Sequence, residues 1–227
     1  MIDVIIHTIR GREIKTLESV KKLNGYTHYD LTIVRDAKTP SHARNYGVLK
    51  AKNDVIAIFD DDVSFTPENF MLMLSKVKKG VCVWSNGSTI LMCRDDYIKL
   101  GGFDERIFRC FGDDSEFLCR MNSLGFKIEY RPELVKHKSG KPTFRKRLLG
   151  SFNEPFIYLR YNRKAALYRL ILGFRDINPI IFTANLAYVW GLIYYPFRMN
   201  IGKRSIFDTG LRDSVSRFSR MEKHSLG

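Results

Sequence analysis

The chain has 227 residues, of which 44% are hydrophobic, 13% aromatic and 27% charged. This composition supplies enough apolar material for a buried core and excludes a disordered tail or a collagen-like protein. The length favours one enzyme-sized domain followed by an appendage. The cysteines, Cys82, Cys93, Cys110 and Cys119, include no Cys-x-x-Cys pair, so the sequence indicates neither a zinc knuckle nor a disulfide framework.

The positive charge is concentrated in the C-terminal part of the chain. The formal net charge is +14; residues 1–140 hold 22 Lys and Arg against 19 Asp and Glu, whereas residues 141–227 hold 16 against 5. A segment this basic favours a polyanionic partner, either an anionic membrane surface or a nucleic acid. The opening residues lack a basic leader followed by a long apolar run, so we expect no secretory signal and a cytoplasmic location.

Strands and helices alternate along residues 1–140. Apolar runs, helical spacing and capping residues predict, in chain order, a strand over 3–8, a helix over 13–23, a strand over 29–35, a helix over 41–49, a strand over 54–59, a helix over 67–80, strands over 81–84 and 89–93, a helix over 117–124 and a strand over 127–131. Ser41 and Thr66 are the expected N-caps of the second and third helices. The strand at 54–59 is almost wholly apolar, which predicts a central strand of a parallel sheet covered on both faces. The order indicates an α/β fold.

Beyond residue 140 the sequence changes character. Nine Lys and Arg and one Glu lie between Lys141 and Arg175, interleaved with Phe, Tyr and Leu, as in a basic amphipathic helix on an anionic leaflet. Residues 177–197 carry no charge and are long enough to cross a bilayer, but Asn, Thr and Pro interrupt this run, and its Tyr and Trp favour the water–lipid boundary. We expect a helix in the membrane plane; a helical cap packed on the preceding domain is the alternative.

Asp60, Asp61 and Asp62 are the first candidates for chemistry. They follow the strand at 54–59, at the edge where open α/β sheets bind ligands. Carboxylates at 60 and 62 can converge on a divalent cation that neutralises a diphosphate. A solvated acidic turn is the alternative interpretation.

A second acidic cluster and one histidine complete the candidates. Asp113 and Asp114 precede the helix at 117–124, so either could cap that helix or act as a general base that deprotonates an acceptor hydroxyl. His137 follows the strand at 127–131, where a ring nitrogen could be a third metal ligand. A lone surface histidine is the alternative.

Together and in order, these segments resemble the inverting GT-A glycosyltransferases of family 2. The resemblance rests on four stretches that span about residues 1–140: VIIHTIRGREIKTLESV, SHARNYGVLKAKNDVIAIFDDDV, GGFDERIF…GDDSEFLCRMNSLGFKIEYRPE and VKHK. It implies a GT-A catalytic domain over 1–140, with a mixed Rossmann-like sheet and helices on both faces. EPFIYLRYNRKAALYR resembles the segment that follows this domain in many members, which implies a helical, basic, membrane-associating region over 141–227.

The resemblance implies an activity. The chain is expected to transfer a sugar from a nucleoside-diphosphate sugar to an acceptor hydroxyl with inversion. The basic region predicts a lipid-linked or cell-envelope glycan as acceptor, with the enzyme peripheral or monotopic at the cytosolic membrane face through residues 141–200. No glutamine occurs in the chain, so the Gln-x-x-Arg-Trp element of processive synthases is absent and a single transfer is expected.

The resemblance also implies roles for individual residues. The residues expected to bind the nucleotide sugar are Thr8, Asp36, Arg44, Asp60 and Asp61. Asp62 and His137 are expected to bind Mn²⁺ or Mg²⁺, and Asp114 is expected to be the catalytic base. The residues expected on the side of the sugar or acceptor are Trp84, Gly102 and Asp113. A core tryptophan and a turn glycine are the alternatives for Trp84 and Gly102. His7 stands where the family usually has proline, and Arg35-Asp36 stands where it has an acidic pair.

Other functions are the alternatives to this enzyme. A nucleic-acid-binding protein would use the basic half to follow phosphates, but no RNP-like, helix-turn-helix or zinc motif is visible and the aromatics cluster in an apolar run. A catalytically inactive GT-A scaffold requires carboxylates that do not converge. A sugar nucleotidyltransferase needs a glycine-rich phosphate loop, for which Arg10-Gly11-Arg12 is a poor substitute.

Overall fold

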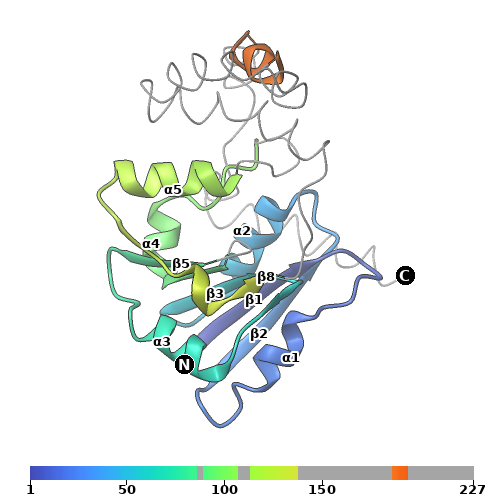
Figure 1. Ribbon diagram of the computed structural model, residues 1–227, viewed down its shortest axis with the longest axis vertical. Coiled ribbons are helices and arrows are strands. Elements are labelled where there is room, and N and C mark those ends of the chain that lie inside the picture. The colour runs from blue at the N-terminus through green and yellow to red at the C-terminus, as the bar shows by residue number, and fades with distance from the viewer. Residues whose placement is uncertain (86–88, 107–112, 138–185, 194–227) are drawn as a thin grey trace.

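The computed structural model describes residues 1–85, 89–106, 113–137 and 186–193. Most of them form a mixed sheet with helices on both faces (Figure 1). The strands are β1 (Ile2–Thr8), β2 (Tyr29–Arg35), β3 (Val55–Asp60), β4 (Val63–Ser64), β5 (Val81–Ser85), β6 (Thr89–Cys93), β7 (Lys127–Tyr130) and β8 (Lys136–His137). The helices are α1 (Thr16–Lys21), α2 (Pro40–Lys50), α3 (Pro67–Leu74), α4 (Arg94–Lys99) and α5 (Asp113–Ser123), with a short 3₁₀ helix (Pro132–Leu134) and a helix at 186–193.

The six-stranded sheet has the order β2-β1-β3-β6-β5-β7. β1 is parallel to both β2 and β3, so these three strands end at the same edge of the sheet. β6 is antiparallel to β3 and to β5, and β7 is parallel to β5. A small second sheet pairs β4 with β8. The expected central position of the strand at 54–59 is confirmed, although its two neighbours run in opposite directions.

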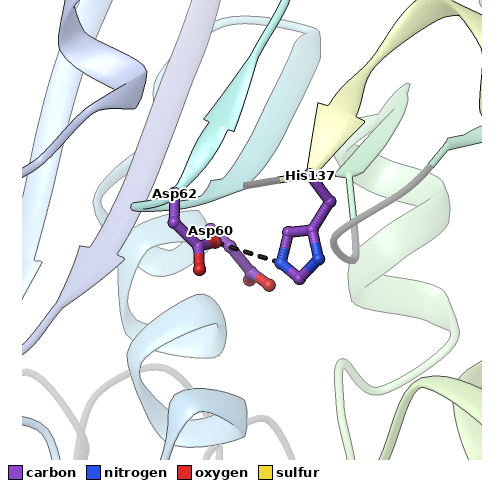
Figure 2. A group of neighbouring side chains, drawn as sticks. All are labelled: Asp60, Asp62 and His137. Carbon is purple, nitrogen blue, oxygen red and sulfur yellow. Dashed lines mark ion pairs between the residues drawn. The ribbon is translucent and has the colours of Figure 1, made fainter. Parts of the chain in front are cut away.

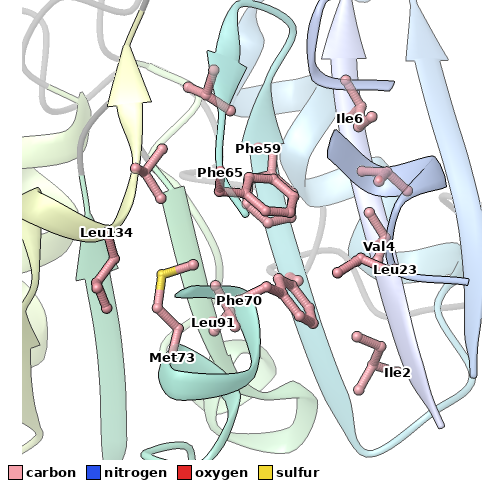
Figure 3. Close-up of a cluster of buried hydrophobic side chains, with 14 of the residues drawn as sticks. Ile2, Val4, Ile6, Leu23, Phe59, Phe65, Phe70, Met73, Leu91 and Leu134 are labelled. Carbon is pink, nitrogen blue, oxygen red and sulfur yellow. The ribbon is translucent and has the colours of Figure 1, made fainter. Parts of the chain in front are cut away.

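Each face of the sheet has its own apolar core. Ile2, Val4 and Ile6 of β1 belong to the cluster that α1 and α3 cover, which Figure 3 draws with Phe59 and Phe70. The other face buries side chains of α2, α4 and α5. Successive residues of a strand point to opposite faces, which explains why most residues of β1 and β3 are apolar.

Helix α2 packs unusually close to β1. A Cβ atom at Gly47 would lie 2.3 Å from Cγ2 of Ile5, so only glycine fits at this point of the helix. The helix begins at Pro40 with Thr39 as its N-cap, because the Thr39 hydroxyl accepts a hydrogen bond from the His42 amide. The close contact brings the first turns of α2 against the edge where β1 and β3 end.

Several helix boundaries differ from the predictions. Thr66 is an N-cap as predicted, but Ser41 lies inside α2 and its hydroxyl donates to Asp113. Helix α3 ends at Leu74, well short of residue 80, because the Ser75 hydroxyl donates to the Leu72 carbonyl and competes with the helical pattern.

Helices α4 and α5 also depart from the prediction. The sequence did not indicate α4, because its six residues are too few for a helical period to emerge. Helix α5 begins at Asp113, so the second acidic cluster is part of its first turn. There its carboxylates lie near the positive end of the helix dipole.

Candidate active site

The ends of the three parallel strands bring the first candidate residues together. In the register of the sheet Thr8 lies opposite Arg35, and His7 lies opposite Asp60. Asp36 directly follows β2. Thr8, Asp36 and Asp60 therefore meet at the carboxyl edge of β2, β1 and β3, where open α/β sheets bind ligands at a change of strand direction.

Asp60, Asp62 and His137 form a cluster that could hold a metal ion. Each offers one ligand atom, and the ligand atoms all lie within 4.8 Å of one another. Figure 2 shows the two carboxylates and the imidazole pointing into one space, with Nε2 of His137 at 3.1 Å from Oδ1 of Asp62. Val63 pairs with His137 across β4 and β8, which carries the imidazole to the aspartates over 75 positions of sequence. Two carboxylate oxygens and one imidazole nitrogen suit Mn²⁺ and also allow Mg²⁺, so the residues fit the expected cation.

Asp61 is not one of the residues of this cluster. It is buried, and its Oδ2 accepts a hydrogen bond from the Thr8 hydroxyl at 2.6 Å. Burial raises the pKa of Asp61, and the Thr8 bond opposes that rise. In the structure Thr8 and Asp61 therefore bond to each other and tie the end of β1 to the turn after β3.

Asp36 and Arg10 form a pair at the end of β2. Asp36 has a φ of 52°, a left-handed conformation that aspartate tolerates better than most residues. Its Oδ1 accepts from the backbone N–H of Arg10 at 2.6 Å, and its Oδ2 lies 3.0 Å from Nε of Arg10. The carboxylate thus binds the loop that follows β1.

Arg44 links the two acidic clusters. Its Nη2 donates to Oδ1 of Asp60 at 3.0 Å, and its Nη1 donates to Oδ2 of Asp113 at 2.7 Å. Nη1 also lies 3.6 Å from Oδ1 of Asp114. The guanidinium stacks over the Phe103 ring, 4.8 Å from its centre, which keeps water from one side. The contacts that the structure gives Arg44 are thus with carboxylates, whereas the sequence predicted contacts with the nucleotide sugar.

The electrostatics of this link follow from its burial. Burial alone lowers the pKa of Arg44, but the charges of Asp113 and Asp60 outweigh it, so the pKa is raised and the guanidinium stays charged. Burial also raises the pKa of Asp60 and lowers that of His7, whose Nε2 lies 3.3 Å from Oδ1 of Asp60. His7 is therefore neutral near pH 7.

Asp113 and Asp114 differ in their surroundings. Asp113 is buried, with 2% of its side chain exposed, and also accepts a hydrogen bond from the Ser41 hydroxyl at 2.9 Å. The Asp114 side chain is 39% exposed. Burial, and then the neighbouring charge of Asp114, raise the pKa of Asp113 to about 7. Of this pair, Asp114 has the carboxylate that a ligand can reach.

Trp84 and Gly102 lie in structural positions. Trp84 is buried in the core under α5, and its carbonyl accepts from the Arg131 N–H at 2.7 Å. Gly102 has a φ of 64°, and its carbonyl accepts from Arg120 at 2.7 Å. These contacts match the core and turn alternatives for the two residues.

Ser41 and Arg12 are site residues that the sequence did not single out. Ser41 was expected to cap α2, and it contacts Asp113 instead. Arg12 lies in the loop after β1, and its Nη2 is 3.0 Å from Oδ2 of Asp62. The available signal was its position, because every loop that follows a parallel strand lies at the ligand-binding edge.

Most of the basic region lies outside the described residues. The basic stretch 141–175, Cys110 and most of the apolar run 177–197 belong there. The part that the structure describes is the helix at 186–193 (Figure 1). Within the described parts of the chain, no helix has the length and hydropathy that a membrane crossing requires.

Comparisons with known proteins agree with this geometry. The model of the family described as Glycosyl transferase family 2 matches residues 15–127. The mannosyltransferase PcManGT from Pyrobaculum calidifontis, solved with GDP-Man and Mn²⁺, superposes with a TM-score of 0.53 at 13% identity, over 96% of this chain and 80% of that one. A mutant Drosophila beta-1,4-galactosyltransferase 7, solved with manganese, UDP-Gal and xylobiose, gives 0.50 at 14% identity, over 61% of this chain and 71% of that one.

No curated protein sequence matches the chain. At these identities the solved structures establish the fold, which is the GT-A fold, and the family match adds the membership. The chain belongs to glycosyl transferase family 2.

Proposed function

We propose that the chain is a metal-dependent, inverting glycosyltransferase that moves one sugar from a nucleoside-diphosphate sugar to an acceptor hydroxyl. The observation that carries the proposal is the convergence of Asp60, Asp62 and His137 at one point, with Asp114 linked to them through Arg44. The two solved enzymes of similar fold were both determined with manganese and a nucleotide sugar, which is GDP-Man in the mannosyltransferase and UDP-Gal in the galactosyltransferase. Convergence of the carboxylates argues against an inactive scaffold.

The donor would bind at the carboxyl edge of β2, β1 and β3. Asp36 and Thr8 lie where the loops begin, and we assign them to the nucleoside side of the donor. A divalent cation on Asp60, Asp62 and His137 would supply positive charge for the diphosphate as it leaves. Asp60 also accepts from Arg44, so its carboxylate is held in place before any ligand arrives.

Asp114 is the proposed general base. Its side chain is 39% exposed and lies in the first turn of α5. Asp113 is bonded to Ser41 and Arg44, which anchors that turn on α2. In this arrangement Asp114 accepts the proton of the acceptor hydroxyl while the oxygen attacks the anomeric carbon, and attack opposite the leaving diphosphate inverts that carbon.

The test is a panel of nucleotide sugars with and without Mn²⁺, followed by release of nucleoside diphosphate. We expect release that needs both the metal and Asp62, so Asp62→Ala is inactive. Asp30→Ala is the matched control, because Asp30 is an exposed carboxylate on β2 near the opposite edge of the sheet. Absence of release from any donor, together with absence of nucleotide binding by calorimetry, would overturn the proposal. The anomeric configuration of the product, measured by NMR, tests inversion.

The acceptor is proposed to be lipid-linked or part of a cell-envelope glycan, reached from the cytosolic membrane face. Residues 141–227 hold 16 Lys and Arg against 5 Asp and Glu, which favours an anionic surface. The helix at 186–193 exposes Leu186, Trp190 and Ile193, whose spacing places them on one side of the helix. We therefore propose residues 1–140 as the catalytic domain and residues 141–227 as the membrane-associating region.

Co-sedimentation with lipid vesicles tests the membrane proposal. We expect binding to vesicles that contain phosphatidylglycerol, weaker binding to phosphatidylcholine alone, and a loss of binding in Trp190→Ala. If equal amounts of protein sediment with both kinds of vesicle, the positive charge of residues 141–227 does not drive membrane binding. Salt-sensitive binding to a nucleic acid, without vesicle binding, would favour the nucleic-acid alternative.

A further inference from the structure

Two arginines neutralise the aspartates at the end of β3, and their surroundings differ. Arg44 lies on α2 with 5% of its side chain exposed, held by Asp60 on one side and Asp113 on the other. Arg12 lies in the loop between β1 and α1, and 51% of its side chain is exposed. Arg44 is therefore a fixed charge, whereas Arg12 can leave its partners without opening the core.

The contacts of Arg12 are with the aspartates next to the metal cluster. Its Nη2 lies 3.0 Å from Oδ2 of Asp62, and its Nε lies 3.3 Å from Oδ2 of Asp61. The other oxygen of Asp62 lies 3.1 Å from Nε2 of His137. One carboxylate thus faces the proposed cation position with one oxygen and the Arg12 guanidinium with the other.

A divalent cation and the guanidinium compete for this carboxylate. Two positive centres that share the Asp62 carboxylate repel each other, and each reduces the charge available to the other. Asp61 offers Arg12 little compensation, because its Oδ2 already accepts from Thr8 at 2.6 Å. Binding of a cation to Asp60, Asp62 and His137 therefore weakens the hold on Arg12.

We propose that Arg12 is an exchangeable counter-ion that couples metal binding to donor binding. Before a cation binds, Arg12 neutralises Asp62; once released, it binds the diphosphate of the donor at the same edge of the sheet. The guanidinium matches phosphate oxygens in a two-point contact, and with 51% of its side chain exposed it can turn toward a ligand at this edge. The inference rests on the proposed function and adds a coupling residue to it.

The coupling has a definite sign. Because Arg12 occupies Asp62, the cation alone binds more weakly than the carboxylates would allow. Because the released guanidinium gains a diphosphate partner, nucleoside diphosphate strengthens cation binding, and the cation strengthens nucleotide binding by the same factor. We expect this factor to be about tenfold in the wild type, in the ordinary range for coupled sites.

The experiment measures Mn²⁺ affinity by calorimetry or electron paramagnetic resonance, without turnover, for the full chain with no nucleotide, with UDP and with GDP. In Arg12→Ala we expect tighter binding of Mn²⁺ alone, by roughly three- to tenfold, and a coupling factor smaller than in the wild type, because only the direct attraction between the cation and the diphosphate remains. Arg12→Lys keeps the charge but loses the two-point contact, so Mn²⁺ alone binds as in the wild type while the coupling falls.

Arg10→Ala is the matched control. Arg10 lies two positions away in the same loop and carries the same charge, but its partner is Asp36. We expect it to leave the affinity for Mn²⁺ alone unchanged. If Arg12→Ala binds Mn²⁺ with unchanged or weaker affinity, Arg12 merely stabilises the turn and the inference is overturned.

Asp62→Asn separates failure of this inference from failure of the proposed function. If Asp62→Asn abolishes Mn²⁺ binding but Arg12→Ala does not tighten it, only the proposed role of Arg12 is overturned. Mn²⁺ binding that does not depend on Asp62, or that is absent from every variant, overturns both the metal site and the coupling.

Discussion

The two acidic clusters contain the same side chain in different settings. Asp60 and Asp62 end a strand and share their space with the imidazole of His137. Asp113 and Asp114 begin a helix, where Ser41 and Arg44 of α2 donate hydrogen bonds to the buried carboxylate of Asp113. Arg44 contacts both clusters, but the ligand atoms of Asp60 and Asp62 also lie around a common space that a cation can fill, whereas the buried carboxylate of Asp113 bonds to Ser41 and Arg44. The comparison indicates that the partners of each carboxylate, more than the residue type, distinguish the proposed metal ligands from the proposed general base.

The largest expected effect is on the second cluster, in Asp114→Asn. Loss of a general base lowers the rate of sugar transfer by about 10²–10⁴-fold. Because Asp114 is not a ligand in the metal cluster, the affinity for Mn²⁺ should stay within a factor of two to three of the wild type. Steady-state rates and Mn²⁺ titrations on the same preparation check both expectations. A variant that loses metal affinity along with rate would remove the distinction between the clusters.

Arg44→Met tests the link between the clusters. Removal of the guanidinium leaves the buried Asp113 and the partly buried Asp60 without this counter-charge, which should lower the free energy of unfolding by about 3–5 kcal/mol. Arg44→Lys keeps a charge but cannot reach two carboxylates in the same way, so an intermediate loss is expected. Urea unfolding near pH 7 measures the difference. A loss below about 1 kcal/mol would mean that the pair contributes little, as exposed pairs do.

Gly47→Ala tests how the second cluster depends on the packing of α2. The added Cβ would lie 2.3 Å from Cγ2 of Ile5, so α2 must move away from β1. We expect a loss of about 1–3 kcal/mol in the free energy of unfolding, as for other overpacked cores. In the Ile5→Ala background the clash is absent, so the same substitution should cost much less. Equal costs in both backgrounds would show that the contact does not determine the position of the helix.

A further expected effect is a pH dependence that belongs to Asp113. Burial and Asp114 raise the pKa of Asp113 from 3.8 to about 7, so the folded state binds its proton more tightly than the unfolded state. The stability that this proton contributes is complete below pH 3.8 and is lost as the pH rises through about 7. Between these limits the wild type should lose stability relative to Asp113→Asn. Urea unfolding of both proteins across this range provides the measurement, and parallel curves would contradict the prediction.

Much of the fold follows from local sequence patterns. The strand at 29–35 was predicted at its observed bounds, and the strands at 3–8 and 54–59 were predicted to within one residue. Apolar β-branched runs fix these elements because both faces of the central strands are covered. The errors concern α4, β4 and β8, both ends of α1, the end of α3 and the start of α5. The end of α3 depends on the bond of the Ser75 hydroxyl to the Leu72 carbonyl, which apolar periodicity does not reveal, whereas α4 is too short for a helical period to emerge.

The sequence by itself determined the α/β class and the family, and it supplied most of the candidate site residues, because these depend on residue type and order along the chain. The tertiary structure decided which of those residues meet. His137 reaches Asp62 because β8 pairs with β4, and Arg44 joins Asp60 to Asp113 because Gly47 lets α2 approach β1. Contacts of this kind join residues far apart in the sequence. They depend on strand pairing and helix packing, which no local pattern of one sequence specifies.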